Sequence, residues 1–265
     1  MLDKNIITYG CRLNIYESEV MQKHLEKAKL TNYILFNSCS VTNEAKKKVI
    51  DDIKKFKKKY PSKKIIVTGC ASQIDNETFL NMKEVEHVIG NKEKMEFETF
   101  LKISNETIKN KISNIMELKT IAPQFIESFE NHSRAFIQIQ NGCDHRCTFC
   151  TIPYGRGNSR SLPIDNIIEQ IKVLNEKGFN EIVLTGVDLT SYGLDLNEKI
   201  NLGKLVEAIL KNNKELKRLR LSSLDSIEID SLLFEIISSD KRIMPHFHLS
   251  MQSGDNMILK RMKRR

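Results

Sequence analysis

Three cysteines in the middle of the sequence have a spacing that could hold a metal cluster. Cys143, Cys147 and Cys150 are separated by three and then two residues, and they follow a strand-like run over residues 135–140. Three thiolates therefore converge within one short loop. Thiolates are the usual ligands of iron–sulfur clusters, and a 4Fe-4S cluster held by only three of them keeps one iron open to an external ligand.

Zinc binding and redox chemistry are the alternatives for this loop. Structural zinc sites normally have four ligands, so a zinc site would need one ligand besides the three thiolates. His145 could supply it, although it lies inside the tight loop. Closely spaced cysteines can also serve as a redox pair. The residue types alone leave these alternatives open.

The other three cysteines, Cys11, Cys39 and Cys70, lie 28 and 31 residues apart and form no local motif. Each follows the end of a predicted strand by two or three residues. In a parallel sheet the strand ends point to one edge, where ligand sites gather. The three thiols can therefore meet in space. The alternative is three buried structural cysteines, because free cysteine is among the most buried residue types.

Short β-branched runs alternate with helical patterns in the first part of the chain. The predicted strands cover residues 5–8, 33–36, 64–68 and 86–89, and the predicted helices cover residues 17–28, 43–59 and 76–83. Such alternation is typical of βαβ units, which form parallel sheets. The fold class expected for residues 1–102 is therefore α/β.

A second series of strands and helices follows a polar stretch. Residues 103–132 are rich in Asn, Lys, Glu and Ser, contain Pro123, and are predicted to form a connector. Residues 133–265 form the second domain, with strands at 135–140, 181–185, 218–221 and 247–251. Its clearest helix opens at Pro163 and ends at Gly178, and the other helices cover residues 202–210 and 227–237.

The chain of 265 residues carries 42 Lys and Arg against 34 Asp and Glu, a net charge of +8. This balance suits a polyanionic partner, and Lys46–Lys48, Lys54–Lys59 and the basic residues 260–265 could contact RNA phosphates or simply be solvated. No apolar run approaches the roughly 18 residues of a membrane span, and residues 1–4 lead into a strand without a signal-peptide core. We therefore expect a cytoplasmic protein with no membrane partner, in which cysteine serves metal or redox chemistry.

The cysteine motifs and their surroundings resemble a known family. The spacing of Cys143, Cys147 and Cys150, with Phe149 before the last cysteine, resembles that of the radical S-adenosylmethionine (SAM) enzymes. The longer string CDHRCTFCTIPYGRGNSRS, together with GCRLN at 10–14, NSCSVT at 37–42 and TGCA at 68–71, resembles the methylthiotransferases. YGRGNSR, GVDLTSYG and HLSMQSG are most similar to the branch that acts on threonylcarbamoyladenosine in tRNA.

The resemblance extends from Thr8 to Arg265 and implies a fold. Members have an N-terminal methylthiotransferase domain, a radical SAM core built as a partial (βα)6 barrel, and a C-terminal RNA-binding TRAM domain. In this sequence the similarity ends where the helix after the fourth barrel strand begins. We therefore expect an incomplete radical SAM barrel at residues 133–265, without its last two βα units and without the TRAM domain.

The resemblance also implies a reaction. Cys143, Cys147 and Cys150 would ligate one 4Fe-4S cluster. Its open iron would bind SAM, and one electron from the cluster would cleave SAM. The resulting radical would remove hydrogen from an adenine C–H. The auxiliary 4Fe-4S cluster, on Cys11, Cys39 and Cys70, would supply the sulfur, and a second SAM would supply the methyl group.

The substrate implied by the resemblance is N6-threonylcarbamoyladenosine at position 37 of tRNA, methylthiolated at C2. The partners would be the tRNA anticodon stem-loop and an electron donor such as a flavodoxin or ferredoxin. Other family members act on isopentenyladenosine in tRNA or on an aspartate of a ribosomal protein. A chain lacking the rest of the barrel could also be an inactive iron–sulfur protein. The sequence identifies neither the sulfur source nor the oligomeric state.

Several polar residues at predicted strand ends are candidates for SAM binding, because cofactor contacts gather at such ends. An equally good reading for each alone is a turn or capping residue. His246 and His248 are expected to be packed or hydrogen-bonded, and no catalytic residue is assigned. With the aromatic residue of the cysteine motif, the cofactor-binding candidates are Phe149, Thr185, Gly186, Asp188, Ser222, Ser223 and Gln252.

Overall fold

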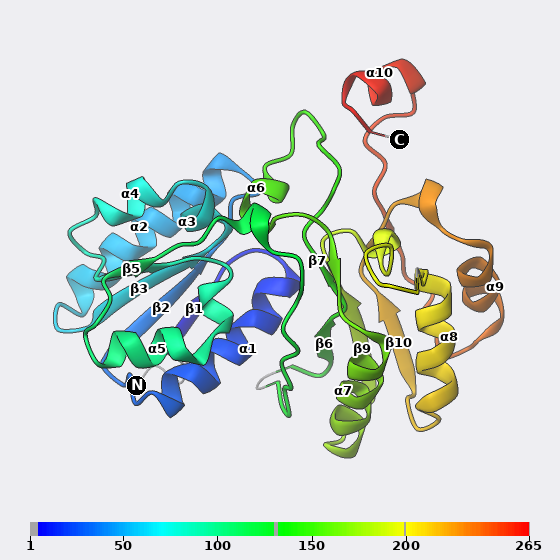
Figure 1. Cartoon of the computed structure of the whole chain (residues 1–265), viewed down its shortest axis with the longest axis horizontal. Helices are drawn as coiled ribbons and strands as arrows, with labels where there is room; N and C mark the ends of the chain where they lie inside the picture. The colour runs from blue at the N-terminus through cyan, green and yellow to red at the C-terminus, as the bar shows by residue number, and fades with distance from the viewer. Residues whose placement is uncertain (1–4, 130–131, 199, 265) are drawn as a thin grey trace. The chain divides into compact units, whose positions relative to one another are not determined.

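The computed structural model describes residues 5–129, 132–198 and 200–264 (Figure 1). Residues 1–4, which carry no signal-peptide core in the sequence, and Arg265, the last of the basic run, lie outside the described residues, as do residues 130–131 of the predicted connector. The chain divides into two compact units. The first comprises Met1–Leu118 and Cys150–Gly157, and the second comprises Lys119–Phe149 and Asn158–Arg265.

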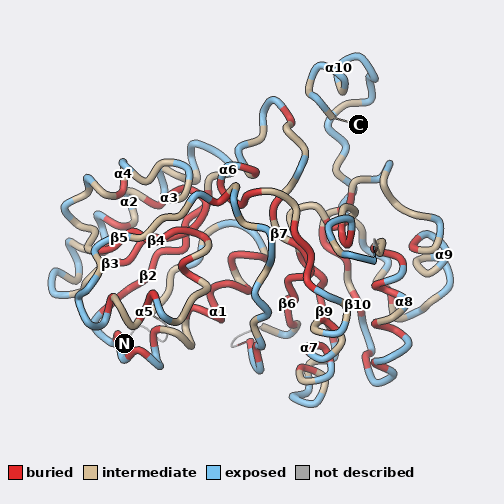
Figure 2. The backbone as a smooth tube through the Cα atoms, viewed as in Figure 1, coloured by how far each residue is buried: buried red, intermediate tan, exposed pale blue. Residues whose placement is uncertain are grey.

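The first unit is built on a parallel sheet of five strands. They pair in the order β1 (Ile6–Thr8), β2 (Tyr33–Ser38), β3 (Lys64–Gly69), β4 (His87–Ile89) and β5 (Asn110–Lys111). Every residue of β2 is buried, as Figure 2 shows for the centre of the sheet. Such continuous burial is typical of parallel strands, which are covered on both faces.

Helices cover both faces of this sheet. Successive side chains of a strand point to opposite faces. Leu35 therefore packs with α1 (Arg12–Lys27) and α5 (Phe97–Ser104), whereas Ile34 packs with α2 (Asn43–Lys59) on the other face. Residues from α3 (Cys70–Ile74) and α4 (Asn76–Leu80) join the second cluster. The α2 helix begins where the Thr42 hydroxyl accepts a hydrogen bond from Ala45 N.

The predicted connector differs from the structure. β5 lies within residues 103–132 and pairs with β4, with Val88 opposite Asn110, and the first unit extends to Leu118. The short helix η2 (Ile115–Glu117) carries the buried Ile115. The sequence did not reveal β5 because this two-residue edge strand is held by main-chain pairing and has no apolar alternation.

The second unit has a parallel sheet of three strands. β6 (Ala135–Gln138), β9 (Glu181–Thr185) and β10 (Arg218–Leu221) are arranged with β9 in the centre. α7 (Ile164–Glu176) lies in the chain between β6 and β9, and α8 (Leu202–Asn212) lies between β9 and β10. The inward face of α7 buries Ile167, Ile171 and Leu174. This unit is therefore also α/β with parallel strands.

The remaining elements of the second unit are short. β7 (Gln140–Asn141) pairs antiparallel with β8 (Arg160–Ser161). The fourth strand predicted at 247–251 is reduced to β12 (His248–Leu249), which pairs with β11 (Ser223–Leu224) instead of β10. Both residues of β12 are exposed, so no buried face prolongs the strand. α9 (Ser231–Ser239) begins later than predicted, at the cap residue Asp230, and α10 (Asn256–Arg261) is the last helix described.

None of the described helices is both long and apolar enough to cross a membrane.

Candidate metal and cofactor sites

The three N-terminal cysteines follow the carboxyl ends of three adjacent parallel strands. Cys39 comes directly after β2, Cys70 comes directly after β3, and Cys11 comes three residues after β1. Because β1, β2 and β3 are neighbours, the register places all three cysteines at one edge of the sheet. Cys39 and Cys70 are buried, whereas Cys11 is exposed. The structure thus brings together residues that the sequence separates by 28 and 31 positions.

Two glycines allow the backbone to approach these cysteines closely. Gly10 has a φ of +91°, and a Cβ atom there would lie 2.7 Å from the Cys39 sulfur. Gly69 has a φ of +102°, and a Cβ atom there would lie 2.2 Å from the Ser38 carbonyl oxygen. A side chain at either position would combine left-handed strain with a clash. The two glycines therefore position the cysteine loops.

The thiols interact electrostatically but are too far apart for a single ion. Burial raises the pKa of the Cys39 thiol, and the charges of Cys70 and Cys11 raise it further. Among the described residues, the sulfur atoms of Cys11, Cys39 and Cys70 are not all within 4.8 Å of one another. In a tetrahedral zinc site with Zn–S distances of about 2.3 Å, the sulfurs would be about 3.8 Å apart. The three sulfur atoms are therefore not arranged as in a zinc site, whereas in a four-iron cluster each thiolate would bind a different iron.

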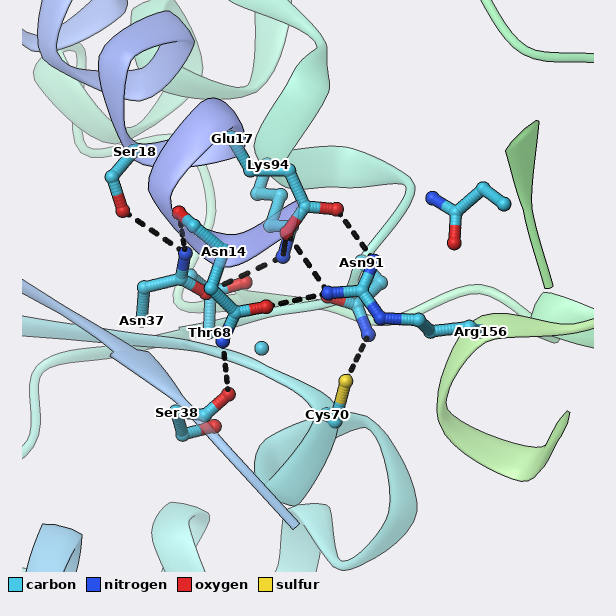
Figure 3. Close-up of polar contacts among 12 residues, drawn as sticks. Asn14, Glu17, Ser18, Asn37, Ser38, Thr68, Cys70, Asn91, Lys94 and Arg156 are labelled. Carbon is cyan, nitrogen blue, oxygen red and sulfur yellow. Dashed lines mark hydrogen bonds and ion pairs between the residues drawn. The ribbon is translucent and has the colours of Figure 1, made fainter. Parts of the chain in front are cut away.

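A fully buried charged network lies beside this edge (Figure 3). Arg156 donates hydrogen bonds to both carboxylate oxygens of Glu17, at 2.8 and 3.1 Å. Lys94 donates to the same carboxylate at 2.6 Å and to Asn37 at 3.3 Å. Burial raises the pKa of the Glu17 carboxyl, but Arg156 and Lys94 outweigh burial and lower that pKa to about 2. Glu17 is therefore ionised at neutral pH.

Asparagine side chains connect this network to the cysteine loops. Asn14 donates to the carbonyl oxygens of Tyr9 and Ser38, at 2.6 and 3.2 Å, and accepts from Arg156. Asn91 lies 3.8 Å from the Cys70 sulfur and donates to the Gly155 carbonyl oxygen at 2.6 Å. These contacts brace the edge where the three cysteines lie.

The segment Cys150–Gly157 belongs to the first unit, although it begins with the last cysteine of the second motif. It includes the short helix α6 (Ile152–Arg156), and a Cβ atom on Gly155 would lie 3.2 Å from the Cys70 Cβ atom. Arg156, Glu17 and Lys94 were not identified as site residues from the sequence. The only signal was the position of Arg156 in the string YGRGNSR.

The second cysteine motif is divided between the two units. Cys143 and Cys147 belong to the second unit and Cys150 belongs to the first. Within the second unit the loop is braced by Arg146, which donates to the Cys143 carbonyl oxygen at 2.7 Å and to Asn158 at 2.6 Å. Cys147 is buried and Cys143 is partly buried. All six cysteines are free thiols.

A buried glutamine holds the turn that follows β9. The Gln140 side-chain oxygen accepts hydrogen bonds from Val187 N and Asp188 N, both at 2.9 Å. Its amide nitrogen donates to the Gly142 carbonyl oxygen at 2.8 Å, directly before Cys143. A Cβ atom on Gly186 would lie 2.9 Å from the Gln140 oxygen, so the turn needs glycine there. Gln140 was also missed from the sequence, since it was counted only as the end of a strand.

Three ionisable side chains gather at the same strand end. His145 Nε2 lies 3.3 Å from an Asp188 carboxylate oxygen and 3.6 Å from a Glu228 oxygen. Among the described residues, these three form the group whose metal-ligating atoms lie within 4.8 Å of one another. The Cys143 sulfur lies 3.7 Å from Asp188. His145 therefore faces carboxylates, which does not support its role as the fourth ligand of a cysteine-held zinc ion.

The other predicted cofactor residues have different surroundings. Thr185 is buried at the end of β9, and Ser222 is buried between β10 and β11, with its amide donating to the Leu184 carbonyl oxygen at 3.1 Å. Ser223 bonds His248 at 3.1 Å. Phe149 is 52% exposed, and Gln252 is exposed. The structure thus brings Thr185, the Gly186–Asp188 turn and Ser222 to neighbouring strand ends, and leaves Phe149 and Gln252 open to solvent.

Two family models match parts of this chain, and solved structures share its fold. Residues 4–90 match the family described as "Uncharacterized protein family UPF0004", and residues 137–265 match the Radical SAM superfamily. Among solved structures, the methyltransferase TsrM from Kitasatospora setae has a TM-score of 0.58 at 12% identity, covering 93% of this chain and 54% of that one. The cobalamin-dependent enzyme OxsB has a TM-score of 0.60 at 11% identity, covering 95% of this chain and 40% of that one. At such identities the likeness concerns the fold alone. The second part of the chain, residues 137–265, is thus similar to the radical SAM superfamily.

Relatives with assigned names are similar to this chain over nearly all of its length. The chain is 53% identical to "Threonylcarbamoyladenosine tRNA methylthiotransferase MtaB" of Rickettsia prowazekii, over 100% of this chain and 62% of that protein. It is 34% identical to the protein of the same name from Aquifex aeolicus, over 97% of this chain and 64% of that protein. The chain thus spans about three fifths of the length of these relatives. Over the part that they share, the chain is similar to these methylthiotransferases.

Proposed function

We propose that this chain carries the catalytic machinery of a methylthiotransferase that modifies C2 of N6-threonylcarbamoyladenosine at position 37 of tRNA. The observation that carries the proposal is the gathering of Cys11, Cys39 and Cys70 at one sheet edge, in a chain that also has a radical SAM cysteine motif. The names of the relatives from Rickettsia prowazekii and Aquifex aeolicus support the substrate. The auxiliary cluster, which would supply the sulfur, would then lie in the first unit.

Two 4Fe-4S clusters are part of the proposal. Cys143, Cys147 and Cys150 would hold one, and Cys11, Cys39 and Cys70 would hold the other. The three N-terminal sulfur atoms are not all within 4.8 Å of one another among the described residues, which favours a cluster over a single zinc ion. When bound, the clusters would supply the electron that cleaves SAM and the sulfur that is transferred.

The chain's own residues would orient SAM at the strand ends of the second unit. The turn Gly186–Asp188 is held by Gln140, so its backbone geometry is set before any ligand binds. The Asp188 carboxylate, which accepts a hydrogen bond from Ser191 at 2.7 Å, would bind the positively charged amino group of SAM. Thr185, Ser222, Ser223, Gln252 and Phe149 would complete the contacts.

The partners proposed are the tRNA anticodon stem-loop and a flavodoxin or ferredoxin, in the cytoplasm. The α2 helix supports an RNA contact, because its outer face carries several exposed lysines while Val49, Ile53 and Phe56 are buried beneath it. Lysines contribute sequence-independent affinity for phosphates. The exposed lysines are Lys47, Lys48, Lys54, Lys55, Lys58 and Lys59.

The test is the modification of defined RNA substrates. The anaerobically reconstituted chain is incubated with SAM, dithionite and a stem-loop carrying threonylcarbamoyladenosine, and the nucleosides are analysed by mass spectrometry. A methylthio product that requires Cys147 and Cys39 supports the proposal. Cleavage of SAM without any methylthio product on this substrate would contradict it.

A second substrate is included because one relative has a different name. The chain is 30% identical to "tRNA-2-methylthio-N(6)-dimethylallyladenosine synthase" of Thermodesulfovibrio yellowstonii, over 98% of this chain and 62% of that protein. The same assay is therefore run with dimethylallyladenosine in the stem-loop and with a ribosomal protein as acceptor. A product on one of these alone would reassign the substrate, and bound clusters without SAM cleavage would indicate an inactive iron–sulfur protein.

A further inference from the structure

Two buried cations in the first unit share one carboxylate. Arg156 and Lys94 are 2% and 0% exposed, and both bond Glu17, which is 1% exposed. One carboxylate balances one of the two positive charges. A buried charge without a counter-charge is costly, since burial removes the solvation that stabilises it in water. A second negative group nearby would therefore stabilise the remaining positive charge of this network.

The excess positive charge lies next to the N-terminal cysteines. Arg156 interacts electrostatically with Cys70 and Cys11, and Figure 3 shows its guanidinium directed at the Cys70 sulfur. Lys94 also interacts with Cys70. As thiolates of a bound cluster, the cysteines would be the second source of negative charge for this network.

The position of Arg156 is set by packing as well as by charge. The preceding residue, Gly155, lies against Cys70 and is held by Asn91. The guanidinium is fixed by two hydrogen bonds to Glu17 and one to Asn14. A guanidinium fixed in this way cannot move to solvent when the charge of its surroundings changes. Its positive charge therefore stays beside the cysteines.

We propose that Arg156 is a positioning residue that supplies a fixed positive counter-charge to the cluster held by Cys11, Cys39 and Cys70 and thereby raises the reduction potential of that cluster. The inference rests on the proposed function, which assigns the cluster to these cysteines. A four-iron cluster on three thiolates is negatively charged, and one-electron reduction of an iron from the ferric to the ferrous state adds a further negative charge. A nearby cation stabilises the reduced state more than the oxidised state.

The competing explanation is purely structural. Arg156 and Glu17 lie 139 positions apart in sequence, so their ion pair could simply fasten the segment Cys150–Gly157 to α1. In that case a substitution would change the unfolding free energy but leave the potential of the cluster unaltered. The two explanations therefore differ in a measurable property other than enzyme activity.

The test uses the full chain with Cys143, Cys147 and Cys150 all replaced by alanine, so that one cluster site remains. Its iron content comes first: about four irons support the assignment of the cluster, and no iron contradicts the proposed function before Arg156 is considered. The one-electron potential is then measured by dithionite titration followed by electron paramagnetic resonance. We expect Arg156→Met to lower the equilibrium constant for reduction at least tenfold, which lowers the potential of a one-electron couple by about 59 mV. Arg156→Lys should restore most of the potential.

Two further variants make the result decisive. Lys57→Met removes a half-buried cation paired with Glu86, near the opposite ends of the strands, and should leave the potential unaltered. Glu17→Gln removes the shared carboxylate and should shift the potential in the positive direction. If Arg156→Met does not fold, Glu17→Gln decides by this opposite shift. The inference is overturned if the cluster has the same potential in Arg156→Met as in the parent chain. If Arg156→Met does not fold, an unaltered potential in Glu17→Gln overturns it.

Discussion

The side-chain oxygen of Gln140 lies 2.9 Å from the backbone nitrogen of Asp188 and accepts its hydrogen bond. The same oxygen accepts from Val187 N, while the amide nitrogen of Gln140 holds the Gly142 carbonyl oxygen beside Cys143. One buried side chain therefore connects the turn proposed to bind SAM with the start of the cysteine loop.

Replacing Gln140 should weaken SAM binding. Gln140→Leu leaves two partly buried backbone N–H groups without an acceptor, and a fully buried one costs about 1–3 kcal/mol. The turn should rearrange, so we expect the dissociation constant for SAM, measured by calorimetry on the reconstituted chain, to rise roughly ten- to a hundredfold. Gln140→Glu keeps the acceptor oxygens and should lose less.

Gln170 provides a matched control for this prediction. Its side chain makes two hydrogen bonds to the backbone of Ile126, at 2.7 and 2.8 Å, and is also buried in the second unit. Gln170→Leu should lower the unfolding free energy without changing the affinity for SAM. Equal affinities in Gln140→Leu and Gln170→Leu would show that Gln140 has no special role.

The two cysteine sets should hold iron independently. After anaerobic reconstitution we expect about eight irons and eight sulfides per chain, as two four-iron clusters require. Cys39→Ala and Cys147→Ala should each reduce the iron content to about four, because their loops arise from different units. Loss of all iron in either variant would contradict independent sites, and a product that contains only zinc would contradict both clusters.

Gly10→Ala should disrupt the N-terminal site. The new methyl group would lie 2.7 Å from the Cys39 sulfur, at a backbone φ of +91°. We expect the thiol to be displaced and the iron content to fall to about four per chain. Gly178→Ala has the same φ but no atom within 4 Å of the added Cβ, so it should cost stability through strain and retain all of its iron.

Glu17 should contribute to acid denaturation of the metal-free chain. Its pKa is about 2 in the folded chain against an ordinary value of 4.5. A carboxyl with a depressed pKa stabilises the fold fully above its unfolded pKa, and this contribution is lost as the pH falls from about 4.5 towards about 2. The shift corresponds to about 3 kcal/mol. Urea unfolding at about pH 5 and about pH 3 measures the loss.

Glu17→Gln is the comparison for this measurement. The variant should be less stable at neutral pH, because both cations stay buried without a carboxylate. Its unfolding free energy should fall less between the two pH values than that of the unaltered chain. An identical pH dependence in the two proteins would mean that Glu17 does not titrate as its surroundings require.

Local sequence patterns predicted much of the fold. The β-branched runs located β2 and β3 to within two residues, and the apolar spacing located α2 and α7, since periodicity reports which side of an element is buried. The strand ends then placed Cys11, Cys39 and Cys70 at one edge, because parallel strands share a direction. The short strand β5 could not be predicted, since main-chain pairing leaves no pattern in side chains, and of the strand predicted at 247–251 the structure keeps only β12.

Only the tertiary structure revealed the residues that surround the sites. Arg156 meets Glu17 across 139 positions, and Gln140 meets Asp188 across 48. Neither pair has a spacing that marks it in the sequence, because such contacts depend on how distant segments pack. The sequence by itself determined the cysteine motifs, the parallel strands and the family resemblance. The charge beside Cys70 and the support of the Asp188 turn depended on packing, since a buried side chain bonds whichever polar group the fold brings within reach.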